Sequence, residues 1–159
     1  MSTADLELFA DYFQFYIQDE DAEGDLSSSW TTEALNRRLA LAPGTVGVRT
    51  LRNSDVPVRL EFHHVEPPAD FDAWDHVVEC SIDVPSGRLV VAGCTDYFPE
   101  ALRFEIGPGP WRVRVSYGGL DGHDHYRLQL WPGGARGVSI AKMGEPGDAP
   151  VDGPHEHAC

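Results

Sequence analysis

The sequence predicts an all-β protein, an antiparallel β-sandwich of about eight strands with one short helix. Three observations predict it. Polar and apolar residues alternate over many short segments, glycine and proline turns separate these segments, and a single stretch carries the start signals of a helix. A chain of 159 residues can bury a core as one domain. The same alternation also suits a barrel of about eight strands, so sandwich and barrel both remain open.

The strands are expected where the two-residue period of a half-buried strand is clearest. Six such segments lie at residues 13–18, 56–63, 78–84, 102–106, 111–117 and 126–130. Two further strands are expected at residues 45–51 and 88–94. Pro85-Ser86-Gly87 predicts a tight hairpin between its flanking strands. Pro57 lacks an N–H, so its strand is expected at a sheet edge or at a bulge, and such an edge could pair with a second copy in a homodimer.

One helix and a C-terminal tail complete the predicted organisation. Thr31 or Thr32 can cap the helix, Leu35 and Leu39 share a face, and Pro43-Gly44 ends it. The predicted β-sandwich domain covers residues 1–132, and residues 133–159 form a Gly/Pro-rich tail. Within that tail, the stretch 138–140 can add a short edge pairing. Its last residues include His155, His157 and Cys159, which could bind a soft metal but are not expected to form a preorganised site.

The composition is strongly acidic, with a formal net charge of -14 and a pI near 4.7. Such a charge repels nucleic acid and anionic membranes and favours basic partners or cations, although it also serves solubility alone. No apolar run reaches the length of a membrane span and no signal peptide is seen. The three cysteines are too few for a disulfide framework, which favours a reducing, cytoplasmic location. Cys80 and Cys94 are expected to be buried, inert thiols.

An acidic run after the first expected strand is the first candidate site. It lacks the ligand spacing of an EF-hand loop, so a specific calcium site is not favoured. A flexible polyanionic segment suits a basic partner surface, and the competing interpretation is a solvated loop. The candidate partner-binding residues here are Asp19, Glu20, Asp21, Glu23 and Asp25.

A second acidic patch mixes carboxylates with aromatic rings. A partner can bury the rings while the charges steer its approach. The alternative is that Phe71 and Trp74 simply cover one end of the sandwich. The candidate partner-binding residues are Asp70, Asp72, Trp74 and Asp75.

Histidines and aspartates around a late turn raise a metal-binding alternative. Imidazole and carboxylate groups are zinc ligands, but two histidines one residue apart on a strand point to opposite faces. The glycines and aspartate near the turn are also strong turn formers in their own right. The alternative function is therefore a metal-dependent enzyme or a metal-binding sensor that uses His63, His64, Asp121, His123, Asp124 and His125.

Sequence signatures of catalysis are absent from the chain. It has no G-x-S-x-G, H-E-x-x-H, P-loop or C-x-x-C motif, and no basic aromatic surface of the kind that binds nucleic acid. We therefore expect a binding protein rather than an enzyme, with no cofactor and with a basic protein as its partner.

The order of several features resembles the competence protein J family over about residues 10–131. The collinear features are an aromatic strand, a helix start and a late phenylalanine strand before a glycine turn. They are Gln14-Phe15, Trp30-Thr31-Thr32-Glu33-Ala34, and Phe104 before Gly107 and Gly109. The resemblance implies a small acidic bacterial protein that binds and inhibits a DNA-entry nuclease, or an immunity-like partner. It supplies no inhibitory residues, and the extension after Pro132 departs from it.

Overall fold

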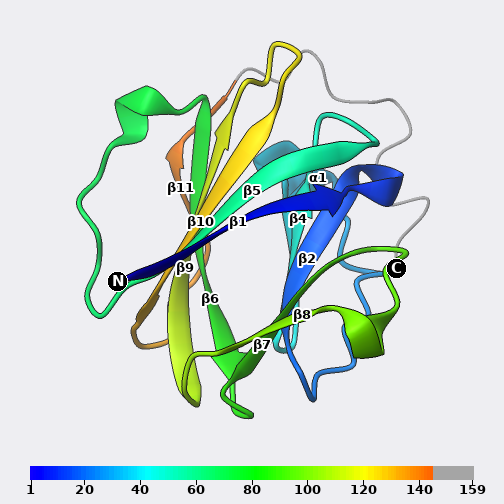
Figure 1. Ribbon diagram of the computed structural model, residues 1–159. Coiled ribbons are helices and arrows are strands. Elements are labelled where there is room, and N and C mark those ends of the chain that lie inside the picture. Colours follow the sequence, from blue (N-terminus) through cyan, green and yellow to red (C-terminus); the bar gives the residue numbers. More distant parts are fainter. Residues whose placement is uncertain (145–159) are drawn as a thin grey trace.

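The computed structural model describes residues 1–144 and confirms the all-β sandwich (Figure 1). Each of its two sheets begins and ends with its own edge strand, so the fold is a sandwich and not a closed barrel. One sheet holds, in spatial order, β1 (Ser2–Phe9), β5 (Asp55–Phe62), β10 (His125–Pro132), β9 (Gly109–Gly118), β6 (His76–Val84) and β11 (Ser139–Lys142). The other holds β3 (Leu39–Ala42), β4 (Thr45–Arg49), β2 (Gln14–Asp19), β7 (Arg88–Gly93) and β8 (Leu102–Glu105).

The core lies between the two sheets and follows from the alternation in the sequence. Every second residue of the central strands points inward, as with Val113, Val115 and Tyr117 of β9, which are fully buried. Tyr117 and Tyr126 meet edge to face with ring centroids 5.5 Å apart. Such aromatic pairs stabilise a core beyond the area they bury. Cys80 belongs to this core, and burial raises the pKa of its thiol to about 12.

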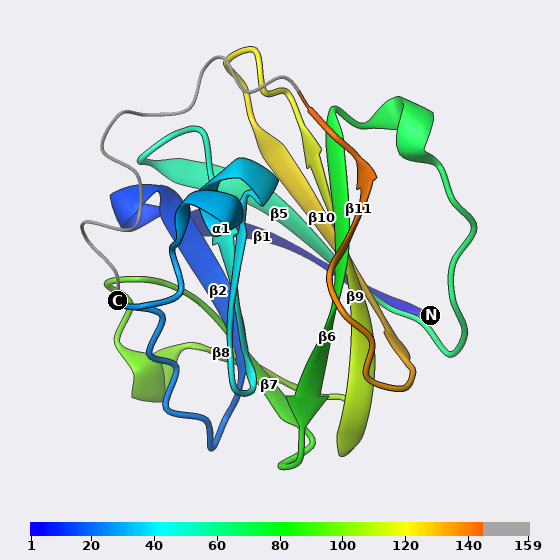
Figure 2. The ribbon, with the colours of Figure 1, turned by 180° about the vertical axis from the view of Figure 1, so that it is seen from behind.

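A second apolar cluster covers the outer face of the five-stranded sheet, where α1 (Thr32–Arg37) lies in Figure 2. The loop after β2 and the helix lay Leu26, Trp30 and Ala34 onto that sheet. Gly47 of β4 permits this close approach, because a Cβ there would stand 2.7 Å from the Leu26 side chain. This loop therefore has a buried half that anchors it and an acidic half that faces water.

The helix begins where the sequence predicts but ends early. The Thr31 hydroxyl accepts a hydrogen bond from Ala34 N at 3.2 Å, and Arg38 takes a left-handed conformation with φ of 64° that terminates the helix. The expectation that the helix runs to Pro43-Gly44 is wrong. Residues 39–42 instead form β3, because Leu39 and Ala40 bury on opposite faces of a sheet, and Pro43-Gly44 is the turn into β4.

The expected edge position of the strand around Pro57 is also wrong. β1 pairs with β5 on one side, and β10 pairs with it in parallel on the other, so the sheet is not wholly antiparallel. Pro57 is tolerated because the pairing with β10 begins only at Val58. A homodimer through this strand is therefore blocked by β1.

Several smaller features of the described residues also bear on the predictions. β11 pairs with β6, so the edge pairing anticipated in the tail does occur. The expectation that Cys94 is a buried, inert thiol is wrong, because Cys94 is half-buried and forms a disulfide, whereas Cys80 is a buried free thiol. His155, His157 and Cys159 lie outside the described residues. Within residues 1–144, no helix has the length and apolar character needed to cross a membrane.

Candidate functional site

An acidic hollow of about 390 Å³ opens at one end of the sandwich. We use the name acidic hollow for the space between the loop after β2, the β3–β4 turn and the β6–β7 turn. Ala22, Ala42, Pro43 and Pro85 supply small apolar walls. The carboxylates that line it are Asp19, Asp21, Glu23, Asp25 and Asp83.

Asp19 belongs to the framework of the hollow rather than to its open surface. Its side chain is buried, and its Oδ1 accepts hydrogen bonds from the Ser86 backbone N at 3.0 Å and from Ser86 Oγ at 2.5 Å. Its Oδ2 accepts from the Asp21 backbone N at 3.1 Å. These bonds fasten the end of β2 to the β6–β7 turn and hold the acidic loop in place.

The negative charge of Glu20 is compensated by two arginines of the same chain. Its carboxylate pairs with Arg88 of β7 and with Arg103 of β8, the latter at 2.8 Å. The hydrogen bonds from Arg88 and Arg103 hold the pKa of Glu20 below its ordinary value. Of the predicted acidic run, Asp19 and Glu20 are therefore structural.

The rest of the run faces solvent. Asp21, Glu23 and Asp25 are exposed, as is Asp83 on the outer face of β6. Asp25 accepts a hydrogen bond from the Ser27 backbone N at 2.9 Å, and its hydrogen bonds with Ser27 lower its pKa. Within residues 1–144 none of these four carboxylates forms an ion pair.

The scarcity of cations explains why these charges stay uncompensated. The chain has 12 lysines and arginines against 26 acids. Most of the cations are committed to ion pairs within the fold. These are Arg37, Arg52, Arg59, Arg88, Arg103, Arg112, Arg114 and Arg127. The unmatched negative charge is therefore left at exposed acids such as those of the hollow.

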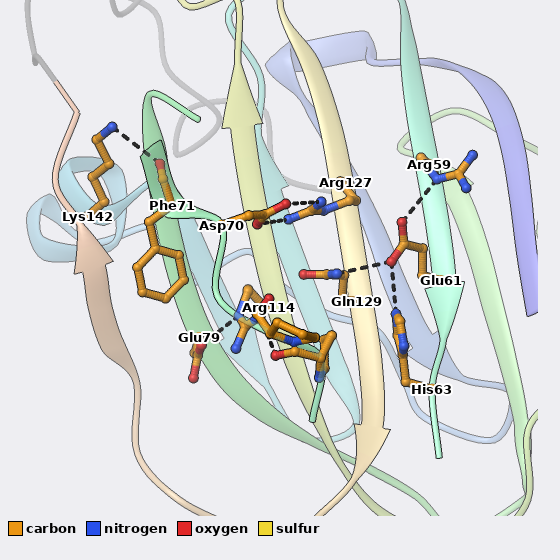
Figure 3. Close-up of polar contacts among 12 residues, drawn as sticks. Arg59, Glu61, His63, Asp70, Phe71, Glu79, Arg114, Arg127, Gln129 and Lys142 are labelled. Carbon is orange, nitrogen blue, oxygen red and sulfur yellow. Dashed lines mark hydrogen bonds and ion pairs between the residues drawn. The ribbon is translucent and has the colours of Figure 1, made fainter. Parts of the chain in front are cut away.

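The outer face of the six-stranded sheet shows the opposite arrangement (Figure 3). We call it the arginine face, after Arg114 and Arg127, which project from β9 and β10. Arg114 is 1% exposed, its Nε donates to Glu79 Oε2 at 2.8 Å, and its Nη1 donates to the Pro67 carbonyl at 3.1 Å. Its guanidinium also lies 5.4 Å from the ring centre of Phe71. Arg114 thus joins the loop before β6 to the sheet.

The second predicted acidic patch lies on this face and is largely used internally. Asp70 makes a two-pronged ion pair with Arg127, at 2.5 and 2.7 Å, and the Arg127 guanidinium stacks 4.8 Å from the Trp74 ring centre. The hydrogen bond from Arg127 lowers the pKa of Asp70. Asp75 accepts from the Leu120 backbone N at 3.0 Å, while Asp72 is simply exposed. The patch thus holds the loop of residues 70–75 against the outer face of the six-stranded sheet.

Glu61 is the most connected acid of the arginine face. The carboxylate lies within hydrogen-bonding distance of Arg59 Nε at 3.0 Å, His63 Nε2 at 2.8 Å and Gln129 Nε2 at 3.0 Å (Figure 3). Burial alone raises the pKa of Glu61, but the hydrogen bonds from Gln129, His63 and Arg59 outweigh it and the pKa falls below its ordinary value. The residue is therefore held as a buried anion.

The predicted histidine and aspartate set is not brought together. In the parallel register of β5 and β10, His125 lies level with Pro57, six residues before His63, which separates the two histidines by about 20 Å at ~3.3 Å per residue. His63 contacts Glu61, and His64 is exposed. Asp121 and His123 are exposed in the turn before β10. No group of three potential ligands forms within residues 1–144.

Two members of that set have structural partners instead. Asp124 is buried, and its carboxylate accepts hydrogen bonds from Arg52 Nε at 2.5 Å, from the Leu51 backbone N at 2.9 Å and from the Tyr126 hydroxyl. Burial raises the pKa of Asp124, but the hydrogen bonds from Tyr126 and Arg52 outweigh this and lower it. His125 packs on the Trp74 ring, with centroids 5.3 Å apart.

Asp83 is the one acid of the hollow that the sequence patterns did not single out. It occupies an outward position of β6, one residue before the strand ends at the β6–β7 turn. Isolated acids at outward strand positions are ordinary, so no local signal separates it from the others. Only the folding of three distant segments onto one end reveals its place.

The comparisons with known proteins place the chain by fold. No family model matches the sequence, and no curated protein matches it. The structure is similar to that of ComJ from Bacillus subtilis, described as the inhibitor of the DNA-degrading activity of NucA. That match has a TM-score of 0.66 and 16% identity, and it covers 84% of this chain and 96% of that one.

A second solved structure, described as crocagin biosynthetic gene J, matches with a TM-score of 0.59 and 22% identity. That match covers 82% of this chain and 97% of the neighbour. The likeness expected from the collinear motifs is therefore present as a shared fold over most of the chain.

Proposed function

We propose that this protein is a non-catalytic inhibitor that binds a basic protein through the acidic hollow, and that its partner is a DNA-degrading nuclease. The observation that carries the proposal is a set of exposed carboxylates, at Asp21, Glu23, Asp25 and Asp83, that form no ion pair with any residue of the described range 1–144. The shared fold with ComJ supports the class of partner.

The physical basis is electrostatic substitution. A nuclease that grips DNA presents lysine and arginine side chains to the phosphates. Carboxylates held on a folded surface meet the same side chains and also accelerate encounter between oppositely charged proteins. Ala42, Pro43 and Pro85 give the hollow walls against which the methylene stem of a lysine or arginine can pack.

The test mixes the full chain with purified nucleases from the same source and follows DNA degradation and association kinetics. We expect stoichiometric inhibition and an association rate that falls steeply with added salt. The triple variant Asp21→Asn, Glu23→Gln, Asp25→Asn should slow association by roughly tenfold at low salt, as expected for electrostatic steering.

A matched control separates the hollow from net charge. Asp55→Asn, Asp72→Asn, Asp121→Asn removes the same charge from exposed sites at the other end of the sandwich. It should slow association by only about twofold, because distant charges are screened. Equal losses in the two triple variants, or inhibition untouched by either, would refute the assignment to the hollow.

A further inference from the structure

Among residues 1–144, two strands on one side of the sandwich have no partner strand at their outer edge. β1 ends the six-stranded sheet and β8 ends the five-stranded sheet, and both lie at the front of the view in Figure 1 and behind in Figure 2. β1 pairs with β5 in unbroken register from Ser2 to Phe9 and holds no proline or glycine. Such an edge offers a row of unpaired backbone groups to another strand.

The side chains of β1 determine which strand that edge accepts. Thr3, Asp5 and Glu7 are exposed on its outer face, while Ala4 and Leu6 are half-buried toward the core. Asp5 shares the Arg59 guanidinium with Glu61, at 3.1 and 3.0 Å. One cation therefore serves two carboxylates, and the outer face of β1 keeps a negative excess.

Pairing of β1 with a second copy is disfavoured by this pattern in the three central antiparallel registers. In antiparallel self-pairing, a register centred on Asp5 places that carboxylate opposite its own copy. A register centred on Leu6 places Asp5 opposite Glu7. A register centred on Glu7 places Glu7 opposite its own copy. Like charges directly opposite each other destabilise a strand pair, whereas opposite charges stabilise it. The edge therefore selects a strand with basic residues at the facing positions.

A partly apolar hollow adjoins the start of β1. A cavity of about 1060 Å³ lies between Met1–Ala4 on one side and the end of β8 on the other. Phe62, Phe104, Ile106 and Trp111 supply its apolar lining, with the Phe62 and Phe104 rings 5.4 Å apart, while His63, His64 and Glu105 also line it. A strand added antiparallel to β1 would bring its C-terminal end to this hollow.

We propose that β1 is a docking edge for an extended segment of a partner protein in which basic residues alternate with apolar ones. The backbone of the segment pairs with β1, its basic side chains face Asp5 and Glu7, and an apolar C-terminal residue enters the hollow beside Phe104 and Ile106. This inference goes beyond the proposed function, because it concerns a different side of the sandwich and holds for any partner with such a segment.

The probe is a synthetic peptide of about nine residues that alternates lysine and valine and ends in phenylalanine, a length that matches the edge strand. The comparison peptide has glutamate in place of lysine. Hydrogen exchange of residues 2–9 in the full chain is measured with each peptide. We expect saturating lysine peptide to slow exchange in this segment by at least about tenfold, because edge amides gain hydrogen-bond partners. The glutamate peptide should leave it unchanged.

Two variants test the determinants separately. Thr3→Lys with Glu7→Lys keeps the Asp5–Arg59 pair and should reverse the preference, so that the glutamate peptide binds roughly tenfold more tightly than the lysine peptide. Ile106→Asp should weaken the lysine peptide by about tenfold, since it places a charge where the apolar C-terminal residue of the peptide packs. Thermal unfolding of each variant verifies that the fold is retained.

The competing outcomes are distinct. Equal binding of the two peptides, or unchanged exchange in residues 2–9, would overturn the proposal. So would protection of β1 that grows with protein concentration in the absence of peptide, because the edge would then belong to a second copy. Loss of nuclease inhibition in the acidic-hollow variants would leave this result unaffected.

Discussion

Residues 19–25 and residues 70–75 are both acid-rich loops that leave the sandwich, yet their charges end in opposite states. In the first loop, Asp21, Glu23 and Asp25 remain exposed around a hollow without ion pairs among the described residues. In the second, Asp70 is held by Arg127, while Asp75 caps a turn. The difference teaches that an acidic loop becomes a binding candidate only where the neighbouring strands leave some of its carboxylates without an arginine.

The neighbouring strands explain this difference. The loop of residues 70–75 folds over β9 and β10, whose outward positions hold Arg114 and Arg127. The hollow is bordered instead by Ala42, Pro43 and Pro85, which offer no charge, while the nearby Arg88 and Arg103 are both taken by Glu20. Four stability predictions test this contrast.

The largest effect is expected from Arg114→Ala on the arginine face. It leaves Glu79 and the Pro67 carbonyl without their buried partner, so we expect a loss of about 3–5 kcal/mol in the free energy of unfolding. Denaturant unfolding measures it, with the exposed Arg136→Ala as the control. A loss below about 1 kcal/mol would mean that the face is not held by this residue.

A smaller effect is expected from Glu61→Gln, at about 2 kcal/mol near neutral pH, because a buried anion with charged hydrogen bonds is lost. The folded state lowers the pKa of Glu61. Its contribution is therefore full above the unfolded value of about 4.3 and declines as pH falls through the lower folded value. Unfolding curves for both proteins should converge toward acidic pH. A difference that persists there would contradict the assignment.

Asp70→Asn should cost less, about 0.5 kcal/mol, because its side chain is 46% exposed and surface ion pairs contribute little. Hydrogen exchange should increase in residues 64–75 and stay constant in β9. The pKa of Asp70 is lowered, so the difference from the parent protein should fade as pH drops below about 4. Unchanged exchange in this loop would show that its other contacts, among them those of Arg114 and Trp74, hold it without Asp70.

The smallest effect is expected from Asp21→Asn, Glu23→Gln, Asp25→Asn in the acidic hollow. Stability should stay constant or rise slightly, because neutralisation relieves repulsion among like charges. Thermal unfolding at low salt provides the measurement, and the gain should vanish at high salt. A clear loss of stability would place these acids with the structural carboxylates and remove the contrast between the two loops.

Much of the fold could be predicted from local pattern. Each of the eight expected strands overlaps an observed strand, because alternation at the strand period records which face is buried. β1 alternates as well, with Ala4, Leu6 and Leu8 turned inward. Its first residues are polar, so the sequence pattern does not reveal it as a strand. The sequence pattern places β3 in the helix, because four residues carry too little periodicity to distinguish a helix from a strand.

The candidate site was harder to predict because charge compensation is not a local property. The sequence placed Asp19 and Glu20 in the same run as Asp21, yet Ser86, Arg88 and Arg103, which bind the first two, follow more than sixty residues later. The sequence also grouped His63 with His125 as possible metal ligands, but the parallel register of β5 and β10 places them far apart.

By itself, the sequence determined the all-β class, the place where the helix begins and the large negative charge, since these depend on periodicity, on capping and on composition, but it left sandwich and barrel open. The tertiary structure alone decided which carboxylates meet an arginine and which stay open to solvent. It also decided which strands are edges. These outcomes depend on contacts between segments far apart in the chain, because an ion pair or an edge is made by what lies beside it in space.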